Sequence, residues 1–205
     1  MARKMDVEGG DFTRGWFRKR NLSTFRELVR PVWTGRPVTY LEIGVFEGMS
    51  MRWVLQQILT STESRAVGID PWLMTRKLSG HEMEMVWSRA LDNTREWGDR
   101  CQLIRSNSHE VLRRMNSRSG FNGIGRNSVD FCMIDGDHNA YAALDDAQQC
   151  LELVKPGGWL LFDDVENDKP KENHVKKGLE MFRTCVGNRV KEVWRHKYMV
   201  CLEVL

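Results

Sequence analysis

The sequence predicts an α/β fold in which a doubly wound, mostly parallel sheet of seven strands ends in an antiparallel strand pair. Short apolar runs rich in strand-forming residues alternate with segments whose apolar residues recur every three or four positions. Residues 129–165 hold a strand, a helix and a second strand, which predicts a right-handed crossover between parallel strands. Residues 189–204 alternate apolar and polar side chains around a turn, which predicts an antiparallel hairpin.

Apolar runs bounded by glycine, polar or acidic residues predict the strands of the parallel part. These runs cover residues 38–43, 66–70, 101–104, 129–134 and 159–162. Residues 155–158 (KPGG) predict a turn before the last of them. The closing hairpin is expected over residues 189–194 and 198–204, with its turn at residues 196–197.

Helical periodicity fills the intervals between these strands, at residues 50–59, 81–97, 109–115, 143–154 and 175–186. Ahead of the sheet, residues 12–30 predict one or two short amphipathic helices. Pro31, Gly35 and Pro37 then predict a loop. Residues 166–172 are rich in charge and predict another loop.

The bulk properties exclude several classes of protein. The 205 residues suit one domain, and a mean hydropathy of −0.50 without a long apolar run excludes a membrane-spanning helix. The N-terminal residues lack the apolar stretch of a secretory signal, so we expect a cytoplasmic protein. Five scattered cysteines without a CxxC pair argue against a zinc site and predict reduced thiols.

The net charge of +3 is unevenly distributed along the chain. Residues 1–36 carry nine Lys and Arg against four Asp and Glu, whereas the remainder carries 22 against 24. We therefore expect residues 1–36 to form a basic helical extension or cap, and residues 37–205 to form the main domain. No RNA-binding signature accompanies the basic segment, which argues against a nucleic-acid partner.

A glycine turn follows the first predicted strand, in the pattern E-x-G-x-x-x-G from Glu42 to Gly48. Glycines at such a turn let the backbone approach a ligand closely and present its N–H groups. The pattern differs from the G-x-G-x-x-G of dinucleotide sites, which argues against NAD or FAD. Asp70 ends the next strand, at a spacing where a carboxylate binds a ribose diol. The two features predict a nucleoside-containing ligand.

Carboxylates end both strands of the crossover: Asp135 and Asp137 the first, Asp163 and Asp164 the second. Because the carboxyl ends of parallel strands lie at one edge of the sheet, these side chains should meet there. Their mutual repulsion needs an opposite charge, and a hard divalent cation such as Mg²⁺ prefers oxygen ligands. Helix and turn capping by the same residues is the alternative explanation.

The segments EIGVFEG, IDGDH, KPGG and FDD, together with Asp70, resemble the class I S-adenosylmethionine-dependent methyltransferases. The last three segments resemble the metal-dependent O-methyltransferases of the macrocin/novobiocin type and, more distantly, of the catechol and caffeoyl-CoA type. The resemblance covers residues 37–165 and implies that residues 37–205 form an S-adenosylmethionine-binding domain.

The resemblance also implies roles for individual residues. S-adenosylmethionine would lie against Glu42, Gly44, Phe46, Gly48, Ser50, Asp70, Ser106, Asn107 and Asp135. Mg²⁺ or another divalent cation would be held by Asp135, Asp163 and Asp164. Catalytic roles fall to His138 and Asp137, and either could be the base that takes a proton from the acceptor. We prefer His138, since histidine ordinarily titrates near neutrality and a nearby dication favours the ionised form of Asp137.

The predicted function is O-methylation of a small hydroxylated molecule, such as a sugar or a phenol of the catechol kind. A metal-independent methyltransferase of the same fold, and a catalytically silent methyltransferase-like binding domain, are the alternatives. We expect the protein to bind a small-molecule acceptor and not to associate with a membrane. The oligomeric state is open, with a homodimer as one option.

Overall fold

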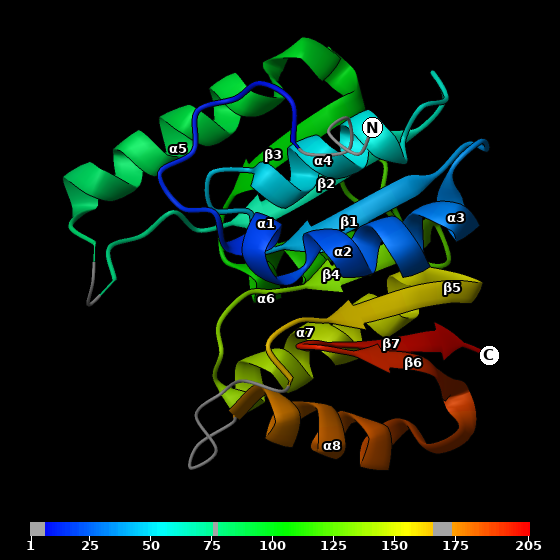
Figure 1. Cartoon of the computed structure of the whole chain (residues 1–205). Helices are drawn as coiled ribbons and strands as arrows, with labels where there is room; N and C mark the ends of the chain where they lie inside the picture. Colours follow the sequence, from blue (N-terminus) through cyan, green and yellow to red (C-terminus); the bar gives the residue numbers. More distant parts are fainter. Residues whose placement is uncertain (1–6, 76–77, 166–173) are drawn as a thin grey trace.

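A computed structural model describes residues 7–75, 78–165 and 174–205 of the chain (Figure 1). Seven strands form one sheet in the order β3-β2-β1-β4-β5-β7-β6. Their bounds are β1 Thr39–Ile43, β2 Arg65–Asp70, β3 Cys101–Arg105, β4 Val129–Ile134, β5 Val154–Phe162, β6 Val190–His196 and β7 Met199–Val204. Strands β1 to β5 pair in parallel, and β7 lies antiparallel between β5 and β6. The predicted fold class is confirmed.

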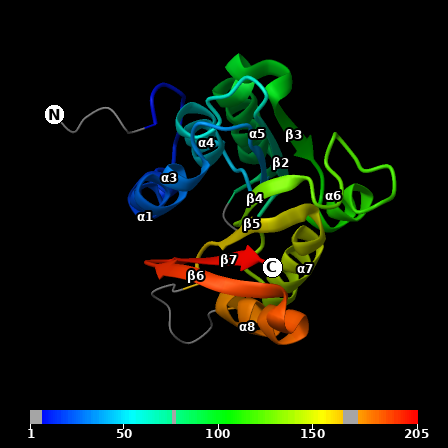
Figure 2. The same cartoon turned by 90° about the vertical axis from the view of Figure 1, so that its right-hand side faces the viewer.

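Helices cover both faces of the sheet (Figure 2). One face carries the N-terminal helices with α4 (Met49–Gln57) and α5 (Gly80–Thr94), and the short 3₁₀ helix η2 (Arg95–Arg100) follows α5. The other face carries α6 (Ser108–Met115), α7 (Ala140–Leu153) and α8 (His174–Val186), and the 3₁₀ turn η3 (Gly187–Arg189) leads into β6. Each face has its own hydrophobic cluster, so both sides of the parallel strands are buried.

The N-terminal segment is more helical than its prolines predict. It comprises α1 (Trp16–Arg20), α2 (Leu22–Thr24), the π-helical η1 (Phe25–Val29) and α3 (Arg30–Trp33). The loop expected at Pro31 is wrong, because the helical run from Leu22 to Trp33 continues through Pro31, directly after the π-helical turn of η1. The expected loop begins only after Trp33.

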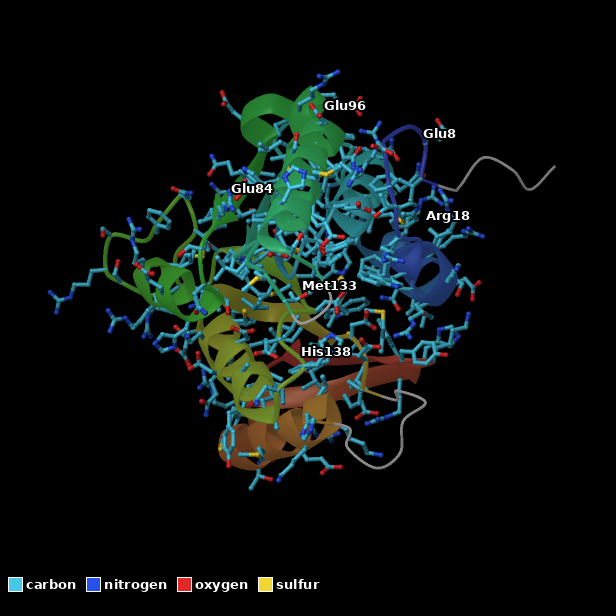
Figure 3. All side chains as sticks on the ribbon, turned by 90° about the vertical axis from the view of Figure 1, so that its left-hand side faces the viewer. Glu8, Arg18, Glu84, Glu96, Met133 and His138 are labelled. Carbon is cyan, nitrogen blue, oxygen red and sulfur yellow. The ribbon has the colours of Figure 1, made fainter. Side chains whose placement is uncertain are left out.

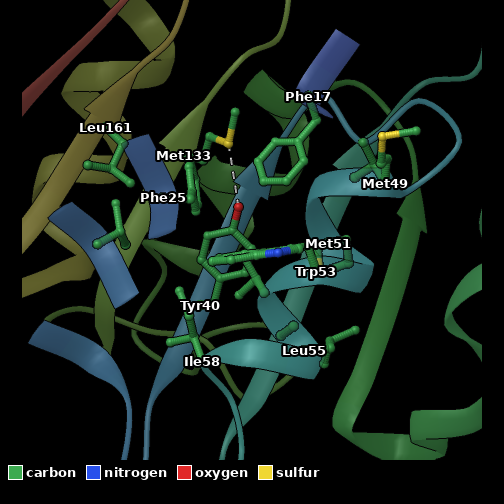
Figure 4. Packing of buried hydrophobic residues seen from close by; sticks show 14 of the residues in the cluster. Phe17, Phe25, Tyr40, Met49, Met51, Trp53, Leu55, Ile58, Met133 and Leu161 are labelled. Atoms are coloured by element: carbon green, nitrogen blue, oxygen red, sulfur yellow. Dashed lines mark hydrogen bonds between the residues drawn. The ribbon is translucent and has the colours of Figure 1, made fainter. Parts of the chain in front are cut away.

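Aromatic side chains attach this segment to the sheet (Figure 4). The Phe25 ring lies edge-on to Trp53 of α4 at 6.0 Å, and edge-on to Phe17 at 5.2 Å between centroids. Farther along, Trp33 stacks on Phe131 of β4 at 5.4 Å. All these rings are buried, so the segment shares one core with α4 and the strands. Burial of each large apolar side chain contributes about 1.5–3 kcal/mol. This packing fixes the N-terminal helices, and with them the residues that connect one helix to the next.

Two smaller expectations need correction. The KPGG segment is not a turn before β5 but an irregularity inside it: Val129 pairs with Val154, whereas Phe131 pairs with Trp159. Lys155 Nζ lies 2.7 Å from Asp130 Oδ1 across this bulge. The hairpin turn falls at residues 197–198, one position later than predicted.

The charged loop expected at residues 166–172 lies outside the described residues. In the part of the chain that the structure describes, every helix is too short or too polar to cross a bilayer.

We expect Gly44→Ala to lower the free energy of unfolding by about 2–5 kcal/mol, the sum of left-handed strain and overpacking. Gly44 has φ +87° just after β1, and an added Cβ would lie 1.9 Å from the carbonyl oxygen of Asp135. Gly35→Ala is the matched control, because Gly35 has φ +89° with no atom within 4 Å of that position. It should cost only the strain, about 1–2 kcal/mol. Urea denaturation at constant m measures both, and equal losses would contradict the contact.

Candidate functional site

The glycine turn and the end of β4 touch through their backbones. The Gly44 N–H donates to the carbonyl of Ile69 at 2.9 Å, and the Asp135 N–H donates to the carbonyl of Ile43 at 2.9 Å. Glycine at position 44 leaves room for the Asp135 carbonyl. The turn after β1 and the IDGDH segment therefore form one surface at the carboxyl edge of the sheet, as the sequence predicts.

Asp70 supports the glycine turn from β2. Its Oδ2 accepts the backbone N–H groups of Val45 and Phe46, each at 3.0 Å, and its Oδ1 accepts that of Trp72 at 2.8 Å. Burial raises the pKa of Asp70, and these three hydrogen bonds oppose the shift. Since a carboxylate offers about four lone-pair positions, Asp70 keeps roughly one for a ribose hydroxyl. Its predicted ribose contact stays a prediction.

Glu42 and Ser50 lie beneath the turn rather than on its surface. Ser50 Oγ donates to Glu42 Oε1, and Tyr40 Oη donates to Oε2 at 3.0 Å. Glu42 is fully buried, and burial raises its pKa to about 8 against the effect of these two donors. The raised pKa favours the neutral form of Glu42, and both of its oxygens are already used within the protein.

The remaining predicted cofactor residues surround this turn. Phe46 has φ +53°, its carbonyl accepts Trp72 Nε1–H at 2.8 Å, and its ring lies 4.9 Å from the exposed Trp16. Gly48, with φ +76°, is the N-cap of α4. The Ser106 N–H donates to the Asp70 carbonyl at 3.2 Å, and Asn107 Oδ1 caps α6 by accepting the His109 N–H at 2.9 Å.

Glu47 is a residue of the turn to which the sequence analysis gave no role. It is 1 % exposed, and its carboxylate accepts both the backbone N–H and the hydroxyl of Thr13 at 2.7 Å. Its backbone carbonyl accepts Asn93 Nδ2 of α5 at 2.8 Å. Glu47 thus joins the glycine turn to the segment ahead of α1. A buried glutamate in the printed sequence is indistinguishable from an exposed one, so no signal identified it.

The predicted carboxylates do meet at the carboxyl edge, and we call Asp135, His138, Asp163 and Asp164 the acid cluster. His138 Nε2 lies 3.4 Å from Asp164 Oδ2 and 3.9 Å from Asp135 Oδ1. Figure 3 labels His138 on the ribbon. One atom each from Asp135, His138 and Asp164 lies within 4.8 Å of the others, a spacing that one ion could bridge.

Asp163 is oriented differently from the other two carboxylates. Its Oδ1 accepts the N–H of Asp164 at 2.8 Å, and its Oδ2 accepts Nδ2 of Asn21 at 2.5 Å. It is 5 % exposed. The structure therefore brings Asp163 to the predicted place but engages both of its oxygens, while His138 completes the group that could hold an ion.

Two residues of the N-terminal segment reach this cluster, and the sequence analysis did not identify them. Arg20 Nη1 lies 2.7 Å from Asp164 Oδ1, and Asn21 bonds Asp163. They lie at the end of α1 and just beyond it, 144 and 142 positions from their partners. The positive charge of residues 1–36 is the sequence feature that is consistent with a contact to these carboxylates.

Burial and the closeness of the three carboxylates raise pKa values in the acid cluster. Burial raises the pKa of Asp135 well above its ordinary value, and the carboxylates of Asp163 and Asp164 raise it further. Burial and Asp164 likewise raise the pKa of Asp163 to about 6, and the Asn21 hydrogen bond opposes this shift. The guanidinium of Arg20 opposes both shifts. The cluster therefore favours any added positive charge.

The carboxylate oxygens of the cluster suit a hard divalent cation such as Mg²⁺ or Mn²⁺, whereas an imidazole nitrogen is a ligand that transition ions prefer. The two carboxylates with raised pKa values supply the physical reason for an ion to bind. Asp137 takes no part in this group: it is exposed, and its Oδ1 accepts the N–H of Asn139 at 3.1 Å.

Residues 41–165 match a family described as a methyltransferase domain, which is more than half of the chain. An uncharacterised protein of Acanthamoeba polyphaga mimivirus is 26% identical over 132 residues, or 63% of this chain. The chain spans about half (52%) of that relative's length.

Two solved structures share the fold. An O-methyltransferase from Bacillus cereus in complex with SAH aligns over 97% of this chain and 84% of its own, with 17% identity and a TM-score of 0.62. The MycE methyltransferase of the mycinamycin pathway, in complex with Mg, SAH and mycinamycin VI, aligns over 95% and 50%, with 17% identity and a TM-score of 0.58. The family match and the strand order agree with the resemblance in the sequence. The chain belongs to this methyltransferase-domain family, and it shares the fold of the two solved methyltransferases.

Proposed function

We propose that this protein transfers the methyl group of S-adenosylmethionine to a hydroxyl of a small molecule, a sugar or a catechol-like phenol, with the help of a divalent cation. The supporting observation is the contact between Gly44 and Asp135, which puts the glycine turn beside the acid cluster at one edge of the sheet. Methyl donor and acceptor would then bind next to each other, and positioning supplies much of the catalysis of an in-line displacement.

The glycine turn is the proposed cofactor site. The surface around Gly44 and Phe46 would receive the methionine part, Asp70 the ribose, and Ser106 with Asn107 the adenine. The solved structures of the same fold that hold SAH support this choice of ligand.

The acid cluster is the proposed acceptor site. When bound, a divalent cation lowers the pKa of a hydroxyl that it coordinates and orients that hydroxyl. Asp135, Asp163 and Asp164 would hold the ion, which leaves His138 free to act as the base. As the acceptor oxygen forms its bond to the methyl carbon, the carbon–sulfur bond breaks, SAH leaves, and His138 takes the hydroxyl proton. Among the described residues, His138 groups with Asp135 and Asp164 and Asp137 does not, which favours His138 as the base.

One contact favours a second candidate, a metal-independent methyltransferase. Arg20 already offers a positive charge to Asp164 at 2.7 Å. In that case Arg20 and His138 alone would orient the acceptor, and the carboxylates would need no ion.

We expect SAH to bind in the micromolar range, equivalent to about 8 kcal/mol, and Asp70→Ala to weaken binding about 5–150-fold. The substitution removes the acceptor of three backbone N–H groups in the turn, and unsatisfied donors cost about 1–3 kcal/mol. Isothermal titration calorimetry measures the affinity. Asp99→Ala, at an exposed position of η2, is the control and should bind normally. Binding of NAD without binding of SAM or SAH would exclude the cofactor assignment.

Chelation should lower methyl transfer by at least about tenfold, and Mg²⁺ should restore it, if an ion holds the acceptor. Transfer of labelled methyl groups from S-adenosylmethionine to a panel of phenols and sugars is the assay. Asp164→Asn should remove the response to Mg²⁺. Asp163→Asn distinguishes the ligand sets, because it removes the response only if Asp163 is a ligand. Full activity after exhaustive chelation would favour the metal-independent candidate.

His138→Ala should reduce kcat about 10²–10⁴-fold with little change in SAH affinity, because it removes the proposed proton acceptor. His109→Ala is the matched control: His109 is exposed and also pairs with an aspartate, its Nδ1 lying 2.7 Å from Asp145 Oδ2. Steady-state kinetics of both variants and of Asp137→Ala decide between the two bases. Near-normal turnover of His138→Ala with loss in Asp137→Ala would reverse their roles.

A further inference from the structure

The N-terminal segment contributes two side chains to the acid cluster. From their contacts we propose that Arg20 is a positioning residue that acts as the built-in counter-charge of Asp164, and that a divalent cation must displace it to bind. Asn21 holds Asp163 in a fixed orientation beside it. This inference rests on the proposed function, since it concerns the same cation site.

Arg20 is well placed for this role. Its Nη1 lies 2.7 Å from Asp164 Oδ1, and its guanidinium lies 5.1 Å from the centre of the Tyr198 ring. The Asp164 side chain is 9% exposed and that of Arg20 is 38% exposed, so the carboxylate is fixed while the guanidinium borders solvent. Asp164 has φ +54°, an uncommon conformation for aspartate, which the contacts around it must maintain.

The two oxygens of Asp164 face different partners: Oδ1 contacts Arg20, and Oδ2 faces His138 at 3.4 Å. A dication at the carboxylate would lie within a few ångströms of the guanidinium. Two such charges repel strongly at that distance, more than they would in bulk water, because the site is partly buried. Arg20 and the cation are therefore alternatives at Asp164, and the long arginine side chain can withdraw into solvent while α1 stays in place.

Asn21 acts on the neighbouring carboxylate. It is 3% exposed, and its Nδ2 donates to Asp163 Oδ2 at 2.5 Å. Its Oδ1 is buried and has no hydrogen-bond partner among the described residues. An unpaired buried acceptor is costly, and a donor arriving with a ligand would satisfy it. Arg20 and Asn21 thus fix the carboxylates of Asp164 and Asp163 without an ion. The Oδ1 atom of Asn21 could accept a hydrogen bond from a ligand.

The test compares Mn²⁺ binding to the full chain, by electron paramagnetic resonance, in the wild type, Arg20→Gln and Lys19→Gln. Lys19 is the matched control, because it is exposed on the same helix and its replacement removes the same charge. We expect Arg20→Gln to bind Mn²⁺ about 2–5-fold more tightly, the fold-change that corresponds to losing one partly exposed competing ion pair. Lys19→Gln should change the affinity by less than about twofold.

A second readout is thermal unfolding with and without Mn²⁺. Without the ion, Arg20→Gln leaves the carboxylates without their counter-charge and should melt at a lower temperature than the wild type. Mn²⁺ should then raise the melting temperature of Arg20→Gln more than that of the wild type, by linkage. A role of Arg20 in packing alone would lower the melting temperature without changing the response to the ion.

The outcomes separate this inference from the proposed function. If the wild type binds Mn²⁺ and Arg20→Gln binds it equally or more weakly, the displacement is wrong while the cation site stands. If the wild type binds no Mn²⁺, the cation site itself is wrong, and this inference fails with it. Should Arg20→Gln not fold, Arg20→Met, which removes the charge and keeps an unbranched side chain, decides: tighter binding than the wild type supports displacement, and unchanged or weaker binding overturns it.

Discussion

The close approach of two backbones, at Gly44 and Asp135, is the constraint on which the rest of the site depends. An added Cβ at Gly44 would meet the Asp135 carbonyl at 1.9 Å, so the two loops fit together only with glycine at that position. Parallel pairing of β1 with β4 brings the loops to the same edge. The proposed cofactor surface and the acid cluster are consequently neighbours because of the topology, and neither could move without the other.

A second feature is the concentration of negative charge at that edge. Burial and mutual repulsion raise the pKa values of Asp135 and Asp163. Burial also raises the pKa of Asp70, but three backbone hydrogen bonds oppose that shift. The protein thus treats its strand-end carboxylates in two ways. Asp70 accepts hydrogen bonds from the backbone N–H groups of the turn that it supports. The carboxylates of the acid cluster repel one another and would be stabilised by a positive charge. Arg20 supplies one such charge.

The N-terminal helices connect these features. Phe17, Phe25 and Trp33 anchor them in the core that covers one face of the sheet, and Arg20 and Asn21 lie between the anchors. Glu47 ties the chain ahead of α1 to the glycine turn. The segment therefore touches both proposed subsites, one through Glu47 and one through Arg20. A basic segment that the charge distribution marked as an extension is in this way part of the surface around the site.

Much of the fold could be predicted from the sequence, because strand and helix periodicity and glycine turns are local properties. The strands, their parallel and antiparallel parts, and the carboxylates at the carboxyl edge all follow from such patterns, as for Asp135 after β4 and Asp163 after β5. Pro31 shows the limit of local rules, since the helical run from Leu22 to Trp33 passes through a residue that usually interrupts a helix.

Only the tertiary structure decided which atoms of the cluster face each other. Asp163 and Asp164 are adjacent in the sequence, yet one is held by Asn21 and the other by Arg20 and His138. The Arg20 contact joins residues 144 positions apart, through a helix whose place is set by aromatic packing on Trp53. The periodicity of apolar residues reports local structure and does not predict contacts between residues so far apart in the sequence. The sequence alone determined which chemical groups reach the edge of the sheet, and long-range packing determined how they are paired.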